Sequence, residues 1–104
     1  MLQRHRKKRI EIVAEALLLD RLLELIKEAG ATGYTVHHYV SGADFNGRQG
    51  EPDDLSLVLK NIQLNVIADD EVAERIVEGC AEFFDDYAEI VVISDVEVIR
   101  PERF

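Results

Sequence analysis

The chain has 104 residues, of which 47% are hydrophobic, 12 are lysine or arginine and 21 are aspartate or glutamate, giving a net charge of −9. This length supports one domain with a modest core and leaves no room for a second domain. No apolar run approaches the roughly 20 residues of a membrane helix, and the basic start is not followed by the apolar core of a signal peptide, so we expect a soluble, cytoplasmic protein.

The basic residues are unevenly distributed along the chain. Five of them lie within the first nine positions, where there is no acidic residue. We therefore expect residues 1–8 to form a flexible basic arm and residues 9–104 to form the domain. The domain itself is strongly acidic, which argues against nucleic acid as a partner. The arm could contact RNA or another anionic surface, although a short charged terminus is more often simply solvated.

The cysteine and histidine content limits the chemistry of the chain. Cys80 is the only cysteine, so it cannot form an internal disulfide. It lies at an apolar position of a helix-like segment, and we expect it to pack in the core. The sequence does not group enough soft ligands for a metal ion, and no metal is predicted.

The first half of the chain alternates strand and helix patterns. Apolar residues recur with a period of two from Arg9 to Ala14, which predicts a strand. Over residues 19–26 they recur at i, i+3, i+4 and i+7, and Gly30 follows as a stop, which predicts a helix. Residues 35–40 are β-branched or aromatic and favour a strand. Residues 42–54 are rich in glycine and aspartate without periodicity, which indicates a long, mobile loop.

The second half repeats this order. Alternating apolar and polar residues within 57–67 predict a strand. Residues 69–84 have near-helical apolar spacing, and the two aspartates at the start can cap and charge a helix. The apolar run at 90–93 is typical of a buried strand, and the alternation continues over 95–98.

The order of predicted elements is therefore β-α-β, loop, β-α-β, which favours an α+β ferredoxin-like sandwich with an antiparallel sheet and both helices on one face. Two helices can cover only one side of such a sheet. The other side still carries apolar residues, so we expect a homo-oligomer that buries them. A monomer or dimer with a polar open face is the alternative.

Two stretches resemble a known protein family. Residues 28–36 read EAGATGYTV and residues 83–91 read FFDDYAEIV, followed by the strand-like DVEVIR at 95–100. They resemble the PII signalling family, and within it the PII-like branch associated with bicarbonate transport and carboxysomes. The likeness covers roughly residues 8–100. It implies a PII-like sandwich with a long T-loop between strands 2 and 3, and a homotrimer with nucleotide sites in the clefts between subunits.

The resemblance also implies which residues bind the nucleotide. The turn at 33–35 matches the Gly-x-Thr turn that meets the adenine edge, and residues 47–50 resemble the Gly-Arg-Gln segment at the base of the T-loop. Arg100 aligns with one phosphate-binding arginine, and Arg103 lies one place from a second. Each of these motifs alone also fits a plain turn, a flexible loop or a solvated tail. The expected nucleotide-binding residues are Gly33, Tyr34, Thr35, Gly47, Arg48, Gln49, Gly50, Val66, Tyr87, Ala88, Arg100 and Arg103.

One segment departs from PII proteins proper. Where they have a glycine- and lysine-rich phosphate loop, residues 85–89 read DDYAE and are acidic. Negative charge disfavours a γ-phosphate unless Mg²⁺ intervenes, so we expect ADP, AMP or cyclic AMP in preference to ATP. The predicted loop contains no tyrosine and the chain does not end in a cysteine pair, so we expect neither the usual covalent regulation of the T-loop nor a redox switch at the tail.

Bicarbonate is a second ligand implied by the carboxysomal members of this branch. Whichever of His37 and His38 faces the cleft could hold this small anion together with Arg48 and Gln49. Histidine titrates near neutrality, so such binding would depend on pH. A strand histidine that is merely exposed at the sheet edge is the alternative.

Three classes of function follow from these patterns. The first is a nucleotide-sensing regulator whose residues 42–56 become ordered and engage a membrane transporter, a carboxysome-related protein or another carbon-fixation partner. The second is an oligomeric ferredoxin-like interaction module without a small-molecule ligand. An enzyme is disfavoured, because adjacent histidines on a strand point to opposite faces and no nucleophile lies at a suitable spacing from a base.

Overall fold

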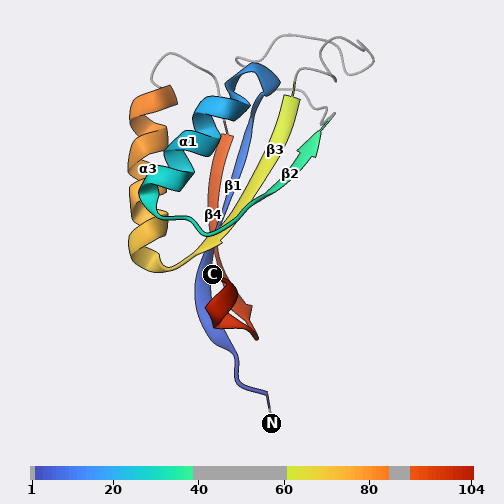
Figure 1. The fold of residues 1–104 in the computed structure, drawn as a ribbon, viewed down its shortest axis with the longest axis vertical. Helices are drawn as coiled ribbons and strands as arrows, with labels where there is room; N and C mark the ends of the chain where they lie inside the picture. Colours follow the sequence, from blue (N-terminus) through green and yellow to red (C-terminus); the bar gives the residue numbers. More distant parts are fainter. Residues whose placement is uncertain (1, 39–60, 85–89) are drawn as a thin grey trace.

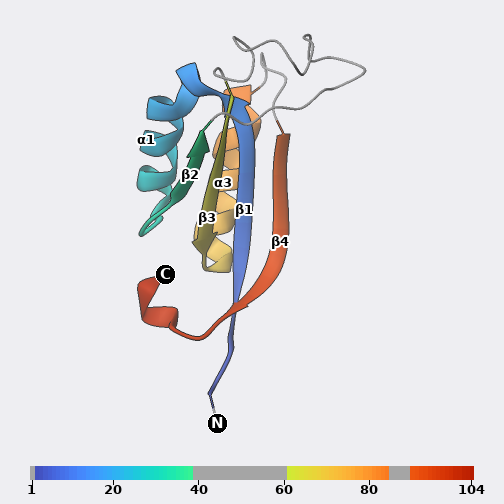
Figure 2. The same ribbon diagram turned by 90° about the vertical axis from the view of Figure 1, so that its right-hand side faces the viewer.

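The computed structural model describes residues 2–38, 61–84 and 90–104. In this part of the chain, a four-stranded antiparallel sheet carries two α-helices on one face, with the strand order β2-β3-β1-β4 (Figures 1 and 2). This confirms the predicted ferredoxin-like sandwich. The elements are β1 (His5–Glu15), the 3-10 turn η1 (Ala16–Leu18), α1 (Leu19–Ala29), β2 (Thr35–His38), β3 (Asn61–Ala68), α3 (Asp70–Phe83), β4 (Ile90–Val98) and the 3-10 turn η3 (Pro101–Arg103).

Strand β1 is longer than its sequence pattern predicts. It begins at His5, which pairs with Val98 of β4, whereas the alternating pattern predicts a start at Arg9. Lys7 and Lys8 are accommodated because each finds a carboxylate partner, on Asp69 and Asp95 respectively. The expectation of a flexible arm over residues 1–8 is therefore wrong for residues 5–8, which belong to the sheet.

The two helices are held closely together at their ends and middles. Helix α1 ends at Gly30, whose φ of 105° lies in the left-handed region that favours glycine. The Nε of Arg75 on α3 donates a hydrogen bond to the carbonyl oxygen of Ala29 at 2.9 Å. Gly79 faces Leu25 so closely that an added Cβ would lie 3.1 Å from the leucine side chain. A side chain at this position would push the helices apart.

The start of α3 differs from its prediction in one detail. Asp69 occupies the N-cap position, but its side chain makes no capping hydrogen bond. Its carboxylate instead accepts a hydrogen bond from Lys7. Asp70 and Glu71 lie in the first turn, where negative charge complements the helix dipole. Asp70 therefore charges the helix start as predicted, with Glu71 beside it, while the expected side-chain cap by Asp69 is replaced by an ion pair with Lys7 of β1.

The hydrophobic core lies between the sheet and the two helices. Its fully buried members alternate along β1 and β3 and recur at helical spacing on α1 and α3, as the sequence pattern predicts. Cys80 is one of them, with 2% of its surface exposed, and burial raises the pKa of its thiol to about 11. Its predicted packing role is confirmed. The largest side chains of the core are Ile10, Ile12, Leu22, Ile62, Leu64 and Ile76.

Strand β4 contradicts the prediction of a buried strand at 90–93. Ile90, Val92 and Ile93 are 43%, 41% and 43% exposed. The reason is topological. Ile93 lies on the helix side of an edge strand that is beside the area covered by α1 and α3, whereas Ile90 and Val92 point to the opposite side of the sheet (Figure 2). The face of the sheet turned away from the helices, which we call the open face, carries Val13 of β1 beside Ile90 of β4, as well as Val92 of β4 and Ile67 of β3.

The helices of the described residues are also too short and too polar to cross a membrane. Both are amphipathic, and their apolar positions are already used to cover the sheet.

Two leucines separated by five positions test this description of the core. Leu22 is 0% exposed, whereas Leu17 is 83% exposed. We expect Leu22→Ala to lower the free energy of unfolding by about 2–5 kcal/mol, because it leaves a cavity under α1. The matched Leu17→Ala should change it by less than about 0.5 kcal/mol. Urea denaturation followed by circular dichroism measures both, and equal losses would contradict the placement of α1.

Candidate functional site

The turn between α1 and β2 is joined to the C-terminal segment. The hydroxyl of Thr32 donates a hydrogen bond of 3.2 Å to the carbonyl oxygen of Arg103, across 71 positions of sequence. The next residues are open to solvent, since a Cβ added to Gly33 would meet no atom within 4 Å and Tyr34 is 54% exposed. Thr35 begins β2 and is also exposed. The predicted turn at 33–35 is therefore an accessible surface held against the end of the chain (Figure 2).

Arg103 lies beside this turn, and Arg100 lies three residues before it in the chain. Arg100 precedes η3, and its carbonyl oxygen accepts a hydrogen bond of 3.2 Å from the backbone amide of Arg103. The two side chains are exposed. The structure therefore brings Arg103, with its neighbour Arg100, to the same end of the sheet as Gly33, Tyr34 and Thr35. Two cations beside an accessible backbone turn can serve an anionic ligand.

Val66 does not belong to this surface through its side chain. It is 1% exposed, pairs with Ile10 and packs in the core on the helix side of the sheet. Strand β2 pairs with β3 only as far as Asn65, so the backbone of Val66 lies just beyond the last β2 pair. The prediction of Val66 as a binding residue is therefore limited to its main chain.

The two histidines of β2 point to opposite sides of the sheet. His37 pairs with Gln63 and shares the open face, whereas His38 pairs with the buried Ile62 and shares the helix side. Both are exposed because β2 is an edge strand. Only one of them can contribute to any one site, as the alternation along a strand requires.

The remaining predicted site residues lie outside the described residues. They stay predictions, and the structure describes only the residues that flank them. His38, Asn61, Phe84 and Ile90 all lie at one end of the sheet, opposite the end that carries Thr32 and Arg103 (Figure 1). The predicted residues concerned are Gly47, Arg48, Gln49, Gly50, Tyr87 and Ala88.

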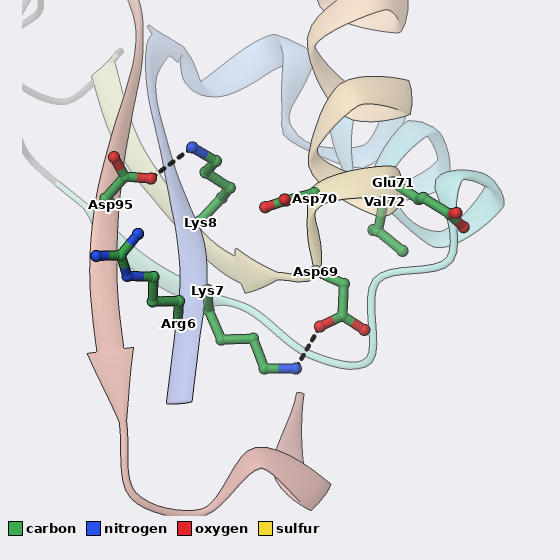
Figure 3. A pocket seen from close by; sticks show the side chains of 8 residues that line it. All are labelled: Arg6, Lys7, Lys8, Asp69, Asp70, Glu71, Val72 and Asp95. Carbon is green, nitrogen blue, oxygen red and sulfur yellow. Dashed lines mark hydrogen bonds and ion pairs between the residues drawn. The ribbon is translucent and has the colours of Figure 1, made fainter. Parts of the chain in front are cut away.

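A charged cavity of about 570 Å³ lies near the start of α3, and sequence reasoning missed it (Figure 3). Its charges largely neutralise one another, because Lys7 binds Asp69 and Lys8 binds Asp95. The available signal was that Lys7 and Lys8 directly precede the predicted strand at 9–14 and could continue it. Both residues fall in the segment that was expected to be a flexible arm. The cavity is lined by Arg6, Lys7, Lys8, Asp69, Asp70, Glu71, Val72 and Asp95.

The ion pair between Lys8 and Asp95 shifts the pKa of both side chains. The hydrogen bond and the positive charge of Lys8 lower the pKa of Asp95, and the same contact raises the pKa of Lys8. Both side chains are accessible to water, which screens their attraction. Across the described residues, no group of three or more His, Cys, Asp or Glu side chains could hold a metal ion.

The described residues thus form an antiparallel ferredoxin-like sandwich, the architecture expected of a PII-like protein, and its C-terminal segment is joined to the turn before β2. The family model of the nitrogen regulatory protein P-II matches residues 7–103. The chain belongs to this family, and the resemblance found in the sequence is confirmed.

Solved structures of related proteins agree with this assignment. CPII from Thiomonas intermedia, bound to ADP and bicarbonate, is 26% identical with a TM-score of 0.85, covering 100% of this chain and 99% of that chain. The same protein bound to ADP, AMP and acetate is 25% identical with a TM-score of 0.83, covering 99% and 98%. A PII-like signalling protein from Thermus thermophilus is 36% identical with a TM-score of 0.77, covering 98% of each chain.

The Lys8–Asp95 pair predicts a defined response of stability to pH. The pKa of Asp95 is lower in the folded than in the unfolded protein, so the pair stabilises the fold above the ordinary value of 3.8 and loses this effect as the pH falls through the lower, folded value. We therefore expect Asp95→Asn to be less stable than the wild type at neutral pH, with a gap that narrows in acid. Urea denaturation across this range measures the gap, and Glu74→Gln on the outer surface of α3 is the control. A gap independent of pH would contradict the ion pair.

Proposed function

We propose that this protein is a PII-like regulator that binds an adenine nucleotide in clefts between copies of the chain. The observation that carries the proposal is the hydrogen bond from Thr32 to Arg103, which holds an arginine-bearing tail against the exposed turn at 33–35. A backbone turn can meet the edge of a base while guanidinium groups meet phosphate oxygens. One end of the sheet thus offers the two kinds of group that a nucleotide requires.

The class of nucleotide follows from two observations. The relative CPII has been solved in two complexes, which align with this chain at 26% and 25% identity. The first contains ADP and bicarbonate, and the second contains ADP, AMP and acetate. In this chain, residues 85–89 carry three acidic residues and no basic one. A third phosphate would meet this negative charge, so ADP, AMP or cyclic AMP binds in preference to ATP.

The separation of the predicted site residues supports a site between copies. β1 and β4 pair continuously from His5–Val98 to Val13–Ile90, a length of roughly 26 Å at the usual strand rise. Arg100 follows one end of this ladder, while residues 85–89, with Tyr87 and Ala88, connect Phe84 to Ile90 at the other. A mononucleotide that meets both groups therefore takes them from different copies, in a homotrimer as in other PII-like proteins.

Bicarbonate binds beside the nucleotide in this proposal. His37 is the histidine on the open face, next to Gln63 in the register, and joins Arg48 and Gln49 in holding the anion.

The regulatory output is assigned to residues 42–56. Ligand binding orders this segment, which then engages or releases a membrane transporter or a carboxysome-related partner in the cytoplasm. The protein acts as a regulator and catalyses no reaction.

Isothermal titration with ADP, AMP, cyclic AMP and ATP, each with and without bicarbonate, tests the ligand. We expect about one nucleotide per chain, weaker binding of ATP than of ADP, and tighter binding when bicarbonate is present. Sedimentation of the same samples gives the number of copies. If an assembled protein binds none of the four nucleotides, the proposed function is wrong and an interaction module without a ligand takes its place.

Thr32 allows a sharper test of the site. Thr32→Val removes the hydroxyl that holds Arg103 while keeping the shape of the side chain, whereas Thr32→Ser keeps the hydroxyl. We expect the valine variant to bind ADP about fivefold more weakly, since one hydrogen bond contributes on the order of 1 kcal/mol, and the serine variant to bind nearly as the wild type.

The arginines complete the series. Arg100→Ala and Arg103→Ala should each weaken ADP by tenfold or more, because each removes a charge-assisted contact to phosphate. Arg21→Ala is the matched control, since Arg21 lies over Phe83 on the helix layer, 4.8 Å from the ring centre. Equal losses in all three variants would point to a general charge effect and remove the assigned site.

A further inference from the structure

The open face of the sheet carries two neighbouring opposite charges on its central strand. Arg9 and Glu11 lie two positions apart on β1, so both point away from the buried Ile10. In the register, Arg9 pairs with Ile67 and Ser94, and Glu11 pairs with Asn65 and Val92. The pair is therefore flanked by apolar and uncharged side chains on both neighbouring strands.

The two charged groups are incompletely satisfied within one copy. The amide of Gln63 donates a hydrogen bond to Oε1 of Glu11, whose carboxylate can accept several more. Arg9 is exposed, and among the described residues none forms an ion pair or hydrogen bond with its guanidinium. Five N–H donors of Arg9 and one oxygen of Glu11 are thus left to water or to another molecule.

The apolar residues beside this pair require a cover. Ile90 and Val92 expose 43% and 41% of their surfaces on the same face, and no helix of the described chain lies over them (Figure 2). Any molecule that covers Val92 also covers its direct neighbour Glu11. Burying a carboxylate is costly unless a cation accompanies it. Among the described residues Glu11 forms no ion pair within its own copy, so a cover that brings a positive charge to this position is favoured.

We infer that the cover is a second copy of this chain, in which Arg9 of one copy pairs with Glu11 of the next. This inference rests on the assembly of several copies that the proposed function requires, and it identifies the contact that sets their register. The face is self-complementary, because it carries one unpaired cation and one half-paired anion side by side. In a closed ring each copy donates one arginine and accepts at one glutamate, so every pair is satisfied.

Other cations of the described residues are less suited to this role. Lys7 is bound to Asp69, and Lys8 lies on the helix side with Asp95. His37 shares the open face but lies in the row of Gln63 and Val13, on the far side of β3 from Glu11. Arg9 is therefore the cation that can reach the neighbouring carboxylate.

Charge reversal followed by charge exchange tests the contact between copies. Arg9→Glu and Glu11→Arg should each raise the dissociation constant of the assembly by roughly 30-fold or more, because like charges then meet in a buried contact. The charge-exchanged double variant Arg9→Glu/Glu11→Arg restores opposite charges at every boundary of a closed ring, whatever the number of copies. We expect this double variant to regain the wild-type mass in a dilution series by analytical ultracentrifugation.

Matched variants on the helix layer provide the control. Lys27→Glu and Glu74→Arg reverse the same kinds of charge on exposed positions of α1 and α3, and both should keep the wild-type mass. Circular dichroism verifies that every variant is folded. The milder Arg9→Gln and Glu11→Gln should weaken the assembly by similar factors, and the double variant by little more than either, if the two side chains act as a pair.

The results separate this inference from the proposed function. Single variants that keep the wild-type mass, a folded charge-exchanged double variant that stays dissociated, or a wild type that is monomeric at every concentration would each overturn the contact. An assembled wild type that binds no nucleotide would overturn the proposed function and leave the contact between copies intact.

Discussion

The register of β1 against its two neighbours is the constraint on which the structure depends. β1 lies at the centre of the sheet and pairs with β3 on one side and β4 on the other. Its even-numbered residues face the helices, so Ile10, Ile12 and Ala14 enter the core. A slip of one residue would turn this apolar set to the open face and bring Arg9 and Glu11 under the helices. The core and the proposed contact between copies thus both depend on the alternation of side chains along β1.

The sheet also separates the molecule into two ends with different tasks. At one end, Gly30 stops α1 and Thr32 holds Arg103 beside an exposed turn, with Arg100 three residues earlier in the chain. At the other end, β2 and α3 lead out of the described structure and β3 and β4 lead back into it. In the proposed assembly the two ends of neighbouring copies meet, so nucleotide binding and assembly become parts of the same event.

The sequence predicts the elements well where local pattern and tertiary environment agree. Helix α1 and its glycine stop, the core alternation of β3 and the buried Cys80 all follow from spacing alone. The misses have physical causes. Lys7 and Lys8 read as a solvated arm because their partners, Asp69 and Asp95, are distant in sequence, and the apolar run at 90–93 cannot reveal that its strand lies at an edge. The turn at 33–35 was visible as a motif, whereas its bond to Arg103 spans 71 positions and required the fold.

The buried thiol of Cys80 can report how often the helix layer separates from the sheet. Cys80 packs between α3 and the sheet, and its high pKa keeps the sulfur protonated and unreactive while that contact is closed. A thiol reagent reaches it only when α3 separates from the strands. The rate of its modification therefore measures how often the helix layer opens, on a scale of free energy, in an unlabelled chain with no second cysteine to confuse the signal.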